Sequence, residues 1–96
     1  MVEFEWDAAK AAANLNKHRV GFQEAATVLE DVLSTTFADE AHSTHERRFV
    51  TIGASERGRL LVVAHTERND TIRIISARRA TRRERAFYEQ GKATEQ

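Results

Sequence analysis

One histidine, one glutamate and one arginine lie within nine residues of the chain, and they have the side-chain types that acid–base catalysis on a phosphodiester requires. They are His65, Glu67 and Arg73. Cleavage of RNA without a metal ion needs a base that takes the ribose 2′-OH proton, an acid that protonates the leaving 5′ oxygen, and a cation that stabilises the phosphorane. Histidine or glutamate suits the first two roles, and arginine suits the third. The alternative is an ordinary Glu–Arg–His pairing on an exposed strand face.

Whether these three side chains meet depends on the loop of a predicted hairpin. Runs rich in aliphatic and β-branched residues predict strands over Leu60–Glu67 and Thr71–Ala77. If the loop is the three residues 68–70, His65 pairs with Arg73, and the three side chains project from one face near the tip. A loop of two or four residues changes the parity, and Arg73 then leaves the cluster.

Arginines concentrate in the segment that follows. Five of the eight residues from 78 to 85 are arginine, and they lie at the end of the last predicted strand and in the first turn of a predicted helix. A helix N-terminus presents free N–H groups that favour an anion, and arginine binds phosphate with two parallel hydrogen bonds. Because acidic residues would suit this helix turn better, the arginines indicate a phosphate-bearing partner. The alternatives are a docking surface for an acidic protein and a merely soluble helix.

Other polar groups have simpler explanations. Lys17 and His18 end the first predicted helix, where cations stabilise the negative end of the helix dipole. His42 and His45 lie in a polar loop with acidic neighbours, but no second group of ligands follows at a metal-binding spacing, so a solvated loop is the better interpretation. The chain also lacks a glycine-rich phosphate loop and a Gly-x-Ser-x-Gly elbow. We therefore expect neither a metal site nor a cofactor.

The charges are distributed unevenly along the chain. Residues 1–45 carry three basic and eight acidic side chains, a net charge of −5, whereas residues 46–96 carry twelve basic and seven acidic ones, a net charge of +5. Twelve of the fifteen basic residues are arginine. An acidic half and a basic half favour a polyanion partner on one face, although two ordinary solvated faces would give the same counts.

Length and composition narrow the class of protein. Ninety-six residues form one domain with a modest core. The absence of cysteine excludes disulfides, zinc ribbons and thiol nucleophiles. No apolar run approaches the roughly 18 residues that cross a membrane, and the N-terminus has no signal-peptide pattern. We therefore expect a cytoplasmic protein that makes no contact with a membrane.

The first third of the chain has the pattern of a strand followed by two helices. Alternating apolar and acidic residues predict a short N-terminal strand over residues 2–6. Asp7 can cap a helix over residues 8–18. Apolar residues spaced three and four apart then predict a second helix over residues 22–31.

From Leu33 onward the period changes to two, which predicts an antiparallel meander of three to four strands. A capping box from Thr81 to Glu84 starts a last helix at Arg82, which runs to about residue 90. The layout predicts an α+β fold: a short N-terminal strand, two helices, the meander and a C-terminal helix. Residues 1–96 form a single domain in this prediction, with residues 91–96 as a frayed tail. The strands of the meander cover residues 48–53, 60–67 and 71–77, with a weaker alternation over residues 33–37.

Several motifs resemble those of the BrnT toxins. The opening matches at Phe4-Glu5-Trp6-Asp7, followed by Lys10, Asn14, Lys17-His18, Phe22 and Ala25. The middle and the end match at Arg48-Phe49, Ile52-Gly53, His65-Thr66-Glu67-Arg68, the run from Ile72 to Thr81, Arg82, Glu84 and Tyr88. The resemblance spans about residues 3–89, and its most specific part is the run of residues 74–78. The chain departs from the family at Arg19 and Gly21, where glycine and serine are frequent, and both positions lie at a helix boundary.

The resemblance implies a type II toxin–antitoxin toxin with a RelE-like fold, acting as a metal-independent endoribonuclease that cleaves RNA and inhibits translation. It implies a BrnA-type antitoxin, a ribbon-helix-helix protein, as the partner that neutralises the toxin. DNA would then be contacted only through the antitoxin, and a toxin–antitoxin heterotetramer is one arrangement of the complex. The alternative is a non-catalytic nucleic-acid-binding or regulatory protein-binding module that uses the same arginines.

The residue reasoning and the resemblance together give two sets of candidate site residues. The catalytic candidates are His65, Glu67, Arg73 and Arg78. The RNA-binding candidates are Arg68, Arg79, Arg82, Arg83, Lys17 and His18. Either His65 or Glu67 would be the base, and the arginines would hold the phosphate.

Overall fold

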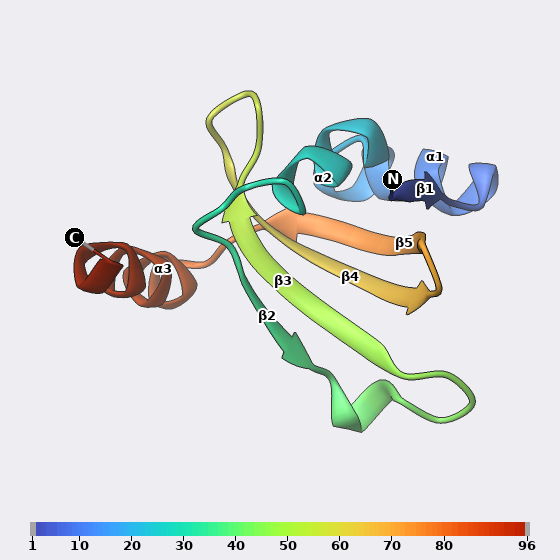
Figure 1. Ribbon diagram of the computed structural model, residues 1–96. Coiled ribbons are helices and arrows are strands. Elements are labelled where there is room, and N and C mark those ends of the chain that lie inside the picture. The colour runs from blue at the N-terminus through green and yellow to red at the C-terminus, as the bar shows by residue number, and fades with distance from the viewer. Residues whose placement is uncertain (1, 96) are drawn as a thin grey trace.

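In the described part of the chain, the sheet is an antiparallel meander of four strands that is extended at one edge by a short parallel strand. The computed structural model describes residues 2–95, with side chains up to residue 91. The sheet has the order β1-β5-β4-β3-β2, and β1 runs parallel to β5 (Figure 1). The α+β class predicted from the sequence is confirmed. The strands are β1 (Glu3–Glu5), β2 (Thr35–Ala38), β3 (Arg48–Ala54), β4 (Leu60–Arg68) and β5 (Thr71–Arg79).

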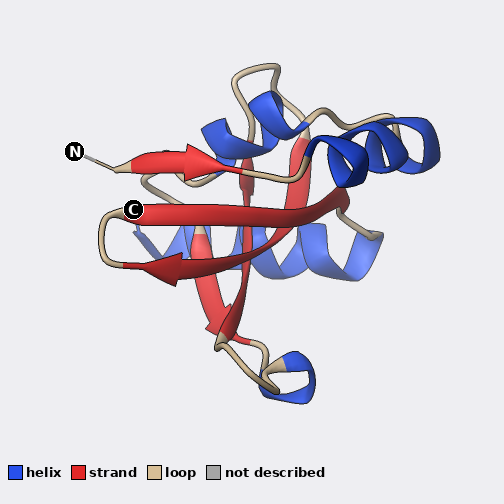
Figure 2. Cartoon of the chain, turned by 90° about the vertical axis from the view of Figure 1, so that its right-hand side faces the viewer, coloured by secondary structure: helices blue, strands red, loops and turns tan. Residues whose placement is uncertain are grey.

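Within residues 2–95, three α-helices flank this sheet. They are α1 (Ala8–His18), α2 (Phe22–Val28) and α3 (Arg82–Glu95), and a short 3-10 helix, η1 (Glu40–His42), lies between β2 and β3. Helices α1 and α2 lie together over the same part of the sheet, whereas α3 lies apart from them (Figures 1 and 2). No helix in the described part of the chain is both long enough and apolar enough to cross a membrane.

The helix ends follow local chemistry. Asp7 caps α1 as predicted, because its carboxylate accepts a hydrogen bond of 3.0 Å from the Lys10 N–H. Arg19 takes a left-handed conformation with φ of 59° and closes the same helix. Helix α2 ends at Val28, earlier than predicted, because the next three N–H groups bond to carbonyls only three residues back. Helix α3 is described as far as Glu95, past the end predicted near residue 90, since one glycine weakens a helix by about 1 kcal/mol without stopping it.

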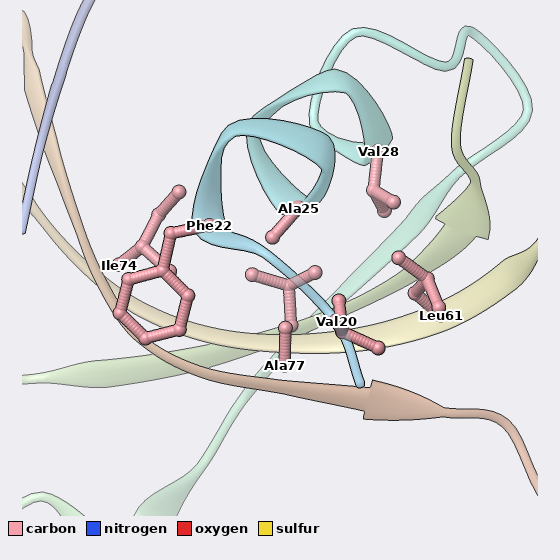
Figure 3. Packing of buried hydrophobic residues seen from close by; sticks show 8 residues of the cluster. Val20, Phe22, Ala25, Val28, Leu61, Ile74 and Ala77 are labelled. Carbon is pink, nitrogen blue, oxygen red and sulfur yellow. The ribbon is translucent and has the colours of Figure 1, made fainter. Parts of the chain in front are cut away.

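The larger core cluster lies between the sheet and the helices α1 and α2. Figure 3 shows α2 above the strands, with apolar side chains filling the space between them. Trp6 meets Phe22 edge to face, with ring centroids 6.0 Å apart. Burying one large aliphatic or aromatic side chain contributes roughly 1.5–3 kcal/mol, so this layer holds both helices against the sheet. We call this side of the sheet the helix face. The buried members are Val20, Phe22, Ala25, Val28, Leu61, Val63, Ile74 and Ala77.

The opposite side of the sheet, which we call the open face, has a smaller core cluster. Tyr88 of α3 packs there against Ile52, Leu60 and Val62. The Tyr88 hydroxyl donates a hydrogen bond of 2.8 Å to Asp31, and burial raises the pKa of Tyr88 to about 12. Because Leu60 begins β4, α3 covers the end of this face that lies away from the β4–β5 turn.

A buried asparagine ties α1 to the sheet. The Asn14 side chain donates hydrogen bonds of 2.9 Å to the Val20 carbonyl and 2.8 Å to the Ala77 carbonyl, and it accepts one of 3.1 Å from the Ala77 N–H. All three bonds are buried, so they satisfy backbone groups that would otherwise lack partners. This contact sets the position of α1 along β5, and with it the position of Lys10 one turn earlier.

Candidate active site

The β4–β5 hairpin turns through two residues rather than three, and the predicted cluster of three catalytic side chains does not form. The register places Thr66 opposite Arg73 and His65 opposite Ile74. Directly paired residues share a face, so Arg73 projects from the open face, whereas His65 and Glu67 project from the helix face. The predicted arrangement is therefore wrong, because a change of one residue in loop length moves a side chain to the other face.

Two local features set this register. Asn69 in the turn has φ of 55°, a conformation that asparagine adopts more readily than most residues. Farther along, Ala64 pairs with Ser76, whereas His65 pairs with Ile74. Ile75 therefore has no partner on β4 and forms a β-bulge. The bulge shifts the alternation along β5 by one residue, so that Ala77 reaches the core beside Val63.

His65 lies in the core of the helix face. Its side chain is 1% exposed, its ring stacks on Phe49 with centroids 5.9 Å apart, and its Nε2 lies 2.8 Å from the Thr51 hydroxyl oxygen. Burial lowers the pKa of His65 to about 4. Its Nδ1 lies 3.5 Å from a carboxylate oxygen of Glu67 and makes no hydrogen bond to any described group. His65 and Glu67 are thus neighbours, as predicted, but only Glu67, whose side chain is 46% exposed, is within reach of a substrate.

The open face presents arginines from three strands. Thr66 of β4 lies between Arg48 of β3 and Arg73 of β5. On its other side, Arg73 pairs with Glu5 of β1. These four side chains therefore form one row across the sheet, which we call the open-face row. Arg68 and Arg78 project from the same face, because their partners are Thr71 and Val62. The sequence pointed to Arg68, Arg73 and Arg78 but did not single out Arg48.

Two adjoining hollows lie along the open-face row. The loop hollow has a volume of about 240 Å³, and the hairpin hollow has a volume of about 430 Å³. Glu46, Thr66 and Arg73 line both hollows. The other residues of the loop hollow are Lys10, His42, Thr44, His45, Arg48 and Ile75. The other residues of the hairpin hollow are Glu5, Arg68, Asn69 and Thr71.

The two histidines of the loop hollow come from the segment between β2 and β3. His42 Nδ1 lies 2.9 Å from the carboxylate of Asp39, the residue that precedes η1. The Ser43 hydroxyl donates to the Asp39 carbonyl at 2.7 Å and accepts from the Arg48 N–H at 2.9 Å, which ties this segment to β3. The sequence favoured a solvated loop here, and both histidines are indeed exposed, but they also line a hollow beside arginines. Among the described residues, no three His, Asp or Glu side chains are grouped as metal ligands would be.

Two acidic side chains accompany the cations of the hollows. Glu5 lies 3.3 Å from Arg73, and Glu46 lies 2.9 Å from Arg68. All four side chains are between 43% and 77% exposed, so water screens these pairs and each contributes about 1 kcal/mol or less. Both arginines can therefore exchange the carboxylate for a phosphate at small cost.

Arg78 has a partner within the fold. It makes two hydrogen bonds, of 2.8 and 2.9 Å, to the Glu84 carboxylate, which also accepts from the Thr81 N–H at 2.8 Å. The Arg78 guanidinium, together with the bond from the Thr81 N–H, lowers the pKa of Glu84 to about 2. The capping box predicted at Thr81 and Glu84 is confirmed, and Arg78 joins it to β5.

The remaining sequence candidates lie away from the two hollows. Lys17 and His18 end α1, and His18 is only partly exposed. Arg79, Arg82 and Arg83 are exposed near the start of α3. None of these five side chains lines the loop hollow or the hairpin hollow.

The sequence profile described as "Ribonuclease toxin, BrnT, of type II toxin-antitoxin system" matches residues 6–84 of the chain. The chain belongs to the BrnT family. The match begins just after β1 and ends in the first turn of α3, so every residue of the two hollows except Glu5 lies inside the BrnT region. The resemblance to BrnT toxins inferred from the sequence is confirmed.

A solved structure shares this fold. The crystal structure of the Brucella abortus ribonuclease toxin BrnT matches with a TM-score of 0.65, covering 85% of this chain and 100% of that chain at 21% sequence identity. At this identity the likeness establishes the fold alone. No curated protein matches the chain at a significant level. Membership of the BrnT family makes the chain a ribonuclease toxin of the type II toxin–antitoxin class, which implies an RNA substrate and an antitoxin partner.

Proposed function

We propose that the chain is a metal-independent endoribonuclease whose reaction takes place in the loop hollow and inhibits translation by destroying RNA. The observation that carries this proposal is the grouping of two exposed histidines with Lys10, Arg48 and Arg73 around one hollow of the open face. Metal-free RNA cleavage needs proton-transfer groups beside phosphate-binding cations, and this hollow holds both kinds of side chain.

His42 suits the role of general base. If Nδ1–H donates to the Asp39 carboxylate, Nε2 is left with a free lone pair, as in hydrolases where a carboxylate fixes the histidine tautomer. Nε2 takes the proton of the ribose 2′-OH, and the 2′ oxygen attacks the phosphorus. The bond from phosphorus to the 5′ oxygen breaks, and His45 donates a proton to that leaving oxygen. The products are a 2′,3′-cyclic phosphate and a 5′-hydroxyl end.

The cations of the hollow stabilise the charge that develops on the phosphorane. Arg48 and Arg73 are separated only by Thr66 in the open-face row, so their guanidinium groups can approach one phosphate from two sides. Lys10 is held at the rim because Asp7 caps its helix and Asn14 fixes that helix on β5. Removing one such charge-stabilising group from an active site typically lowers turnover by about 100- to 1,000-fold.

The BrnT family further suggests how the toxin is controlled. We propose that a ribbon-helix-helix antitoxin of the BrnA type neutralises it, that the pair forms a heterotetramer, and that DNA is contacted through the antitoxin. We also propose that the sheet and helices correspond to the RelE-like architecture. The type II toxin class of the family supports the existence of such an antitoxin partner.

The proposal is tested by incubating purified protein with RNA in excess EDTA and identifying the ends of the products. We expect cleavage to persist with 2′,3′-cyclic phosphate ends, and His42→Ala to lower the rate by about 100-fold or more. His18→Ala is the matched control, since His18 lines neither hollow, and it should keep the wild-type rate. Loss of cleavage in EDTA with recovery on adding one divalent ion would contradict the metal-free mechanism. RNA binding without any cleavage would favour a non-catalytic module.

A further inference from the structure

The hairpin hollow contains carboxylates where a purely phosphate-binding surface would have none. Glu5 and Glu46 line it together with Arg68 and Arg73. The side chains of the two glutamates are about half exposed. A carboxylate beside a phosphate costs binding energy through repulsion, so phosphate binding does not account for these residues. Carboxylates in nucleic-acid sites instead accept hydrogen bonds from the N–H groups of bases.

Glu5 is the better placed of the two carboxylates to recognise a base. It lies on β1 beside Arg73, and regular strand pairing fixes its position in the open-face row. Glu46 lies outside the helices and strands and lines both hollows. Groups on strands are positioned more accurately than groups on loops. The bond from Arg73 to Glu5 involves one carboxylate oxygen at 3.3 Å and is weak enough to exchange. A ligand that displaces Arg73 can therefore bond to both oxygens of Glu5.

We propose that the hairpin hollow binds a guanine base of single-stranded RNA, next to the phosphate that is cleaved in the loop hollow, and that Glu5 determines this preference. The inference rests on the proposed ribonuclease function and names its base specificity. Guanine alone presents two adjacent donors on its Watson–Crick edge, N1–H and the 2-amino group, and these match the two oxygens of one carboxylate. Adenine, cytosine and uracil each place an acceptor next to their donor, so a carboxylate can accept only one hydrogen bond from them.

The other groups of the hollow suit the same ligand. Arginine planes stack on unpaired bases, and Arg68 and Arg73 are both present. The Asn69 amide supplies a donor for guanine O6, while Thr66 and Thr71 supply hydroxyl groups. The volume of about 430 Å³ lies within the range of roughly 300–1,000 Å³ that small-ligand sites occupy. Because the two hollows share Thr66 and Arg73, a base in one is adjacent to a phosphate in the other.

The test compares cleavage of nonamer oligouridylates that carry one central guanosine or one central inosine. Inosine lacks only the 2-amino group, so the ratio of the two kcat/KM values isolates one donor. We expect wild-type protein to prefer guanosine by about tenfold, within the range for a bidentate base contact. The Glu5→Gln variant should bring the ratio close to one, because the amide offers one acceptor and one mismatched donor. Glu3→Gln is the matched control on the same strand and outside the hollow, and it should keep the wild-type ratio.

The same oligonucleotides with 2′-O-methyl groups separate this inference from the ribonuclease function, because they bind but cannot be cleaved. If no RNA is cleaved but the methylated guanosine strand still binds about tenfold tighter than the inosine strand in a Glu5-dependent manner, the ribonuclease proposal fails and the guanine site stands. Equal affinity for both strands overturns the guanine site. A guanosine preference that survives Glu5→Gln overturns the role of Glu5.

Discussion

The buried His65 makes a sharp prediction about stability and pH. Its side chain is 1% exposed, and burial lowers its pKa to about 4 from the ordinary histidine value of 6.5. Between these two values the unfolded chain binds a proton that the folded chain does not bind, so the free energy of unfolding must fall as the pH falls through this window. One pKa unit corresponds to about 1.4 kcal/mol, so the full loss between pH 6.5 and 4 is about 3 kcal/mol.

Urea unfolding at pH 7, 6, 5 and 4 measures this loss directly. Wild-type protein should lose about 1 kcal/mol or more per pH unit below pH 6, whereas His65→Gln should show a much flatter dependence in this window. His45→Gln is the control, because the exposed His45 ring stays in solvent in both states. The Glu84 carboxylate, whose pKa is lowered to about 2, loses its contribution at lower pH, as the pH falls from about 4.5 to 2. A flat wild-type curve, or an unchanged slope in His65→Gln, would refute the buried neutral histidine.

Three further stability predictions follow from single contacts. Asn14→Ala removes three buried hydrogen bonds between α1 and β5 and should cost about 2–4 kcal/mol in urea unfolding; a loss below about 1 kcal/mol would contradict this contact. Gly53→Ala would place a Cβ 2.9 Å from the Cβ of Ser34 and should lower the free energy of unfolding by about 1–3 kcal/mol. Gly91→Ala meets nothing within 4 Å and should be neutral or slightly stabilising. Equal effects of the two variants would contradict the close packing at Gly53. Glu84→Gln breaks the partly exposed pair with Arg78 and should cost about 1 kcal/mol at pH 7 and much less near pH 2. A pH-independent loss would point to packing instead.

The secondary structure could be predicted from the sequence because it depends on local patterns. The Asp7 cap, the capping box at Thr81 and the alternating strands each follow from neighbouring residues. The burial of His65 could also have been predicted, since it shares its face of β4 with Leu61 and Val63, both fully buried.

The candidate site was predicted less well, because it depends on long-range pairing. A one-residue difference in the β4–β5 turn moved Arg73 away from His65, and the bulge at Ile75 has no clear sequence pattern. The open-face row joins strands from both ends of the chain, and nothing in the sequence indicates that β1 pairs in parallel with β5. His42 was visible as a residue of a polar loop, but its place beside Arg48 and Arg73 follows only from the fold.

The central claim is that the loop hollow, and not the arginine cluster at the start of α3, carries the reaction. Arg73 and Arg79 test it as a pair, because they lie on the same strand and project from opposite faces. The measurement is the rate of RNA cleavage by the two alanine variants under single-turnover conditions. We predict that Arg73→Ala lowers the rate by about 100-fold and that Arg79→Ala changes it by a few-fold at most. Wild-type cleavage by Arg73→Ala, or an equal loss in Arg79→Ala, would contradict the account.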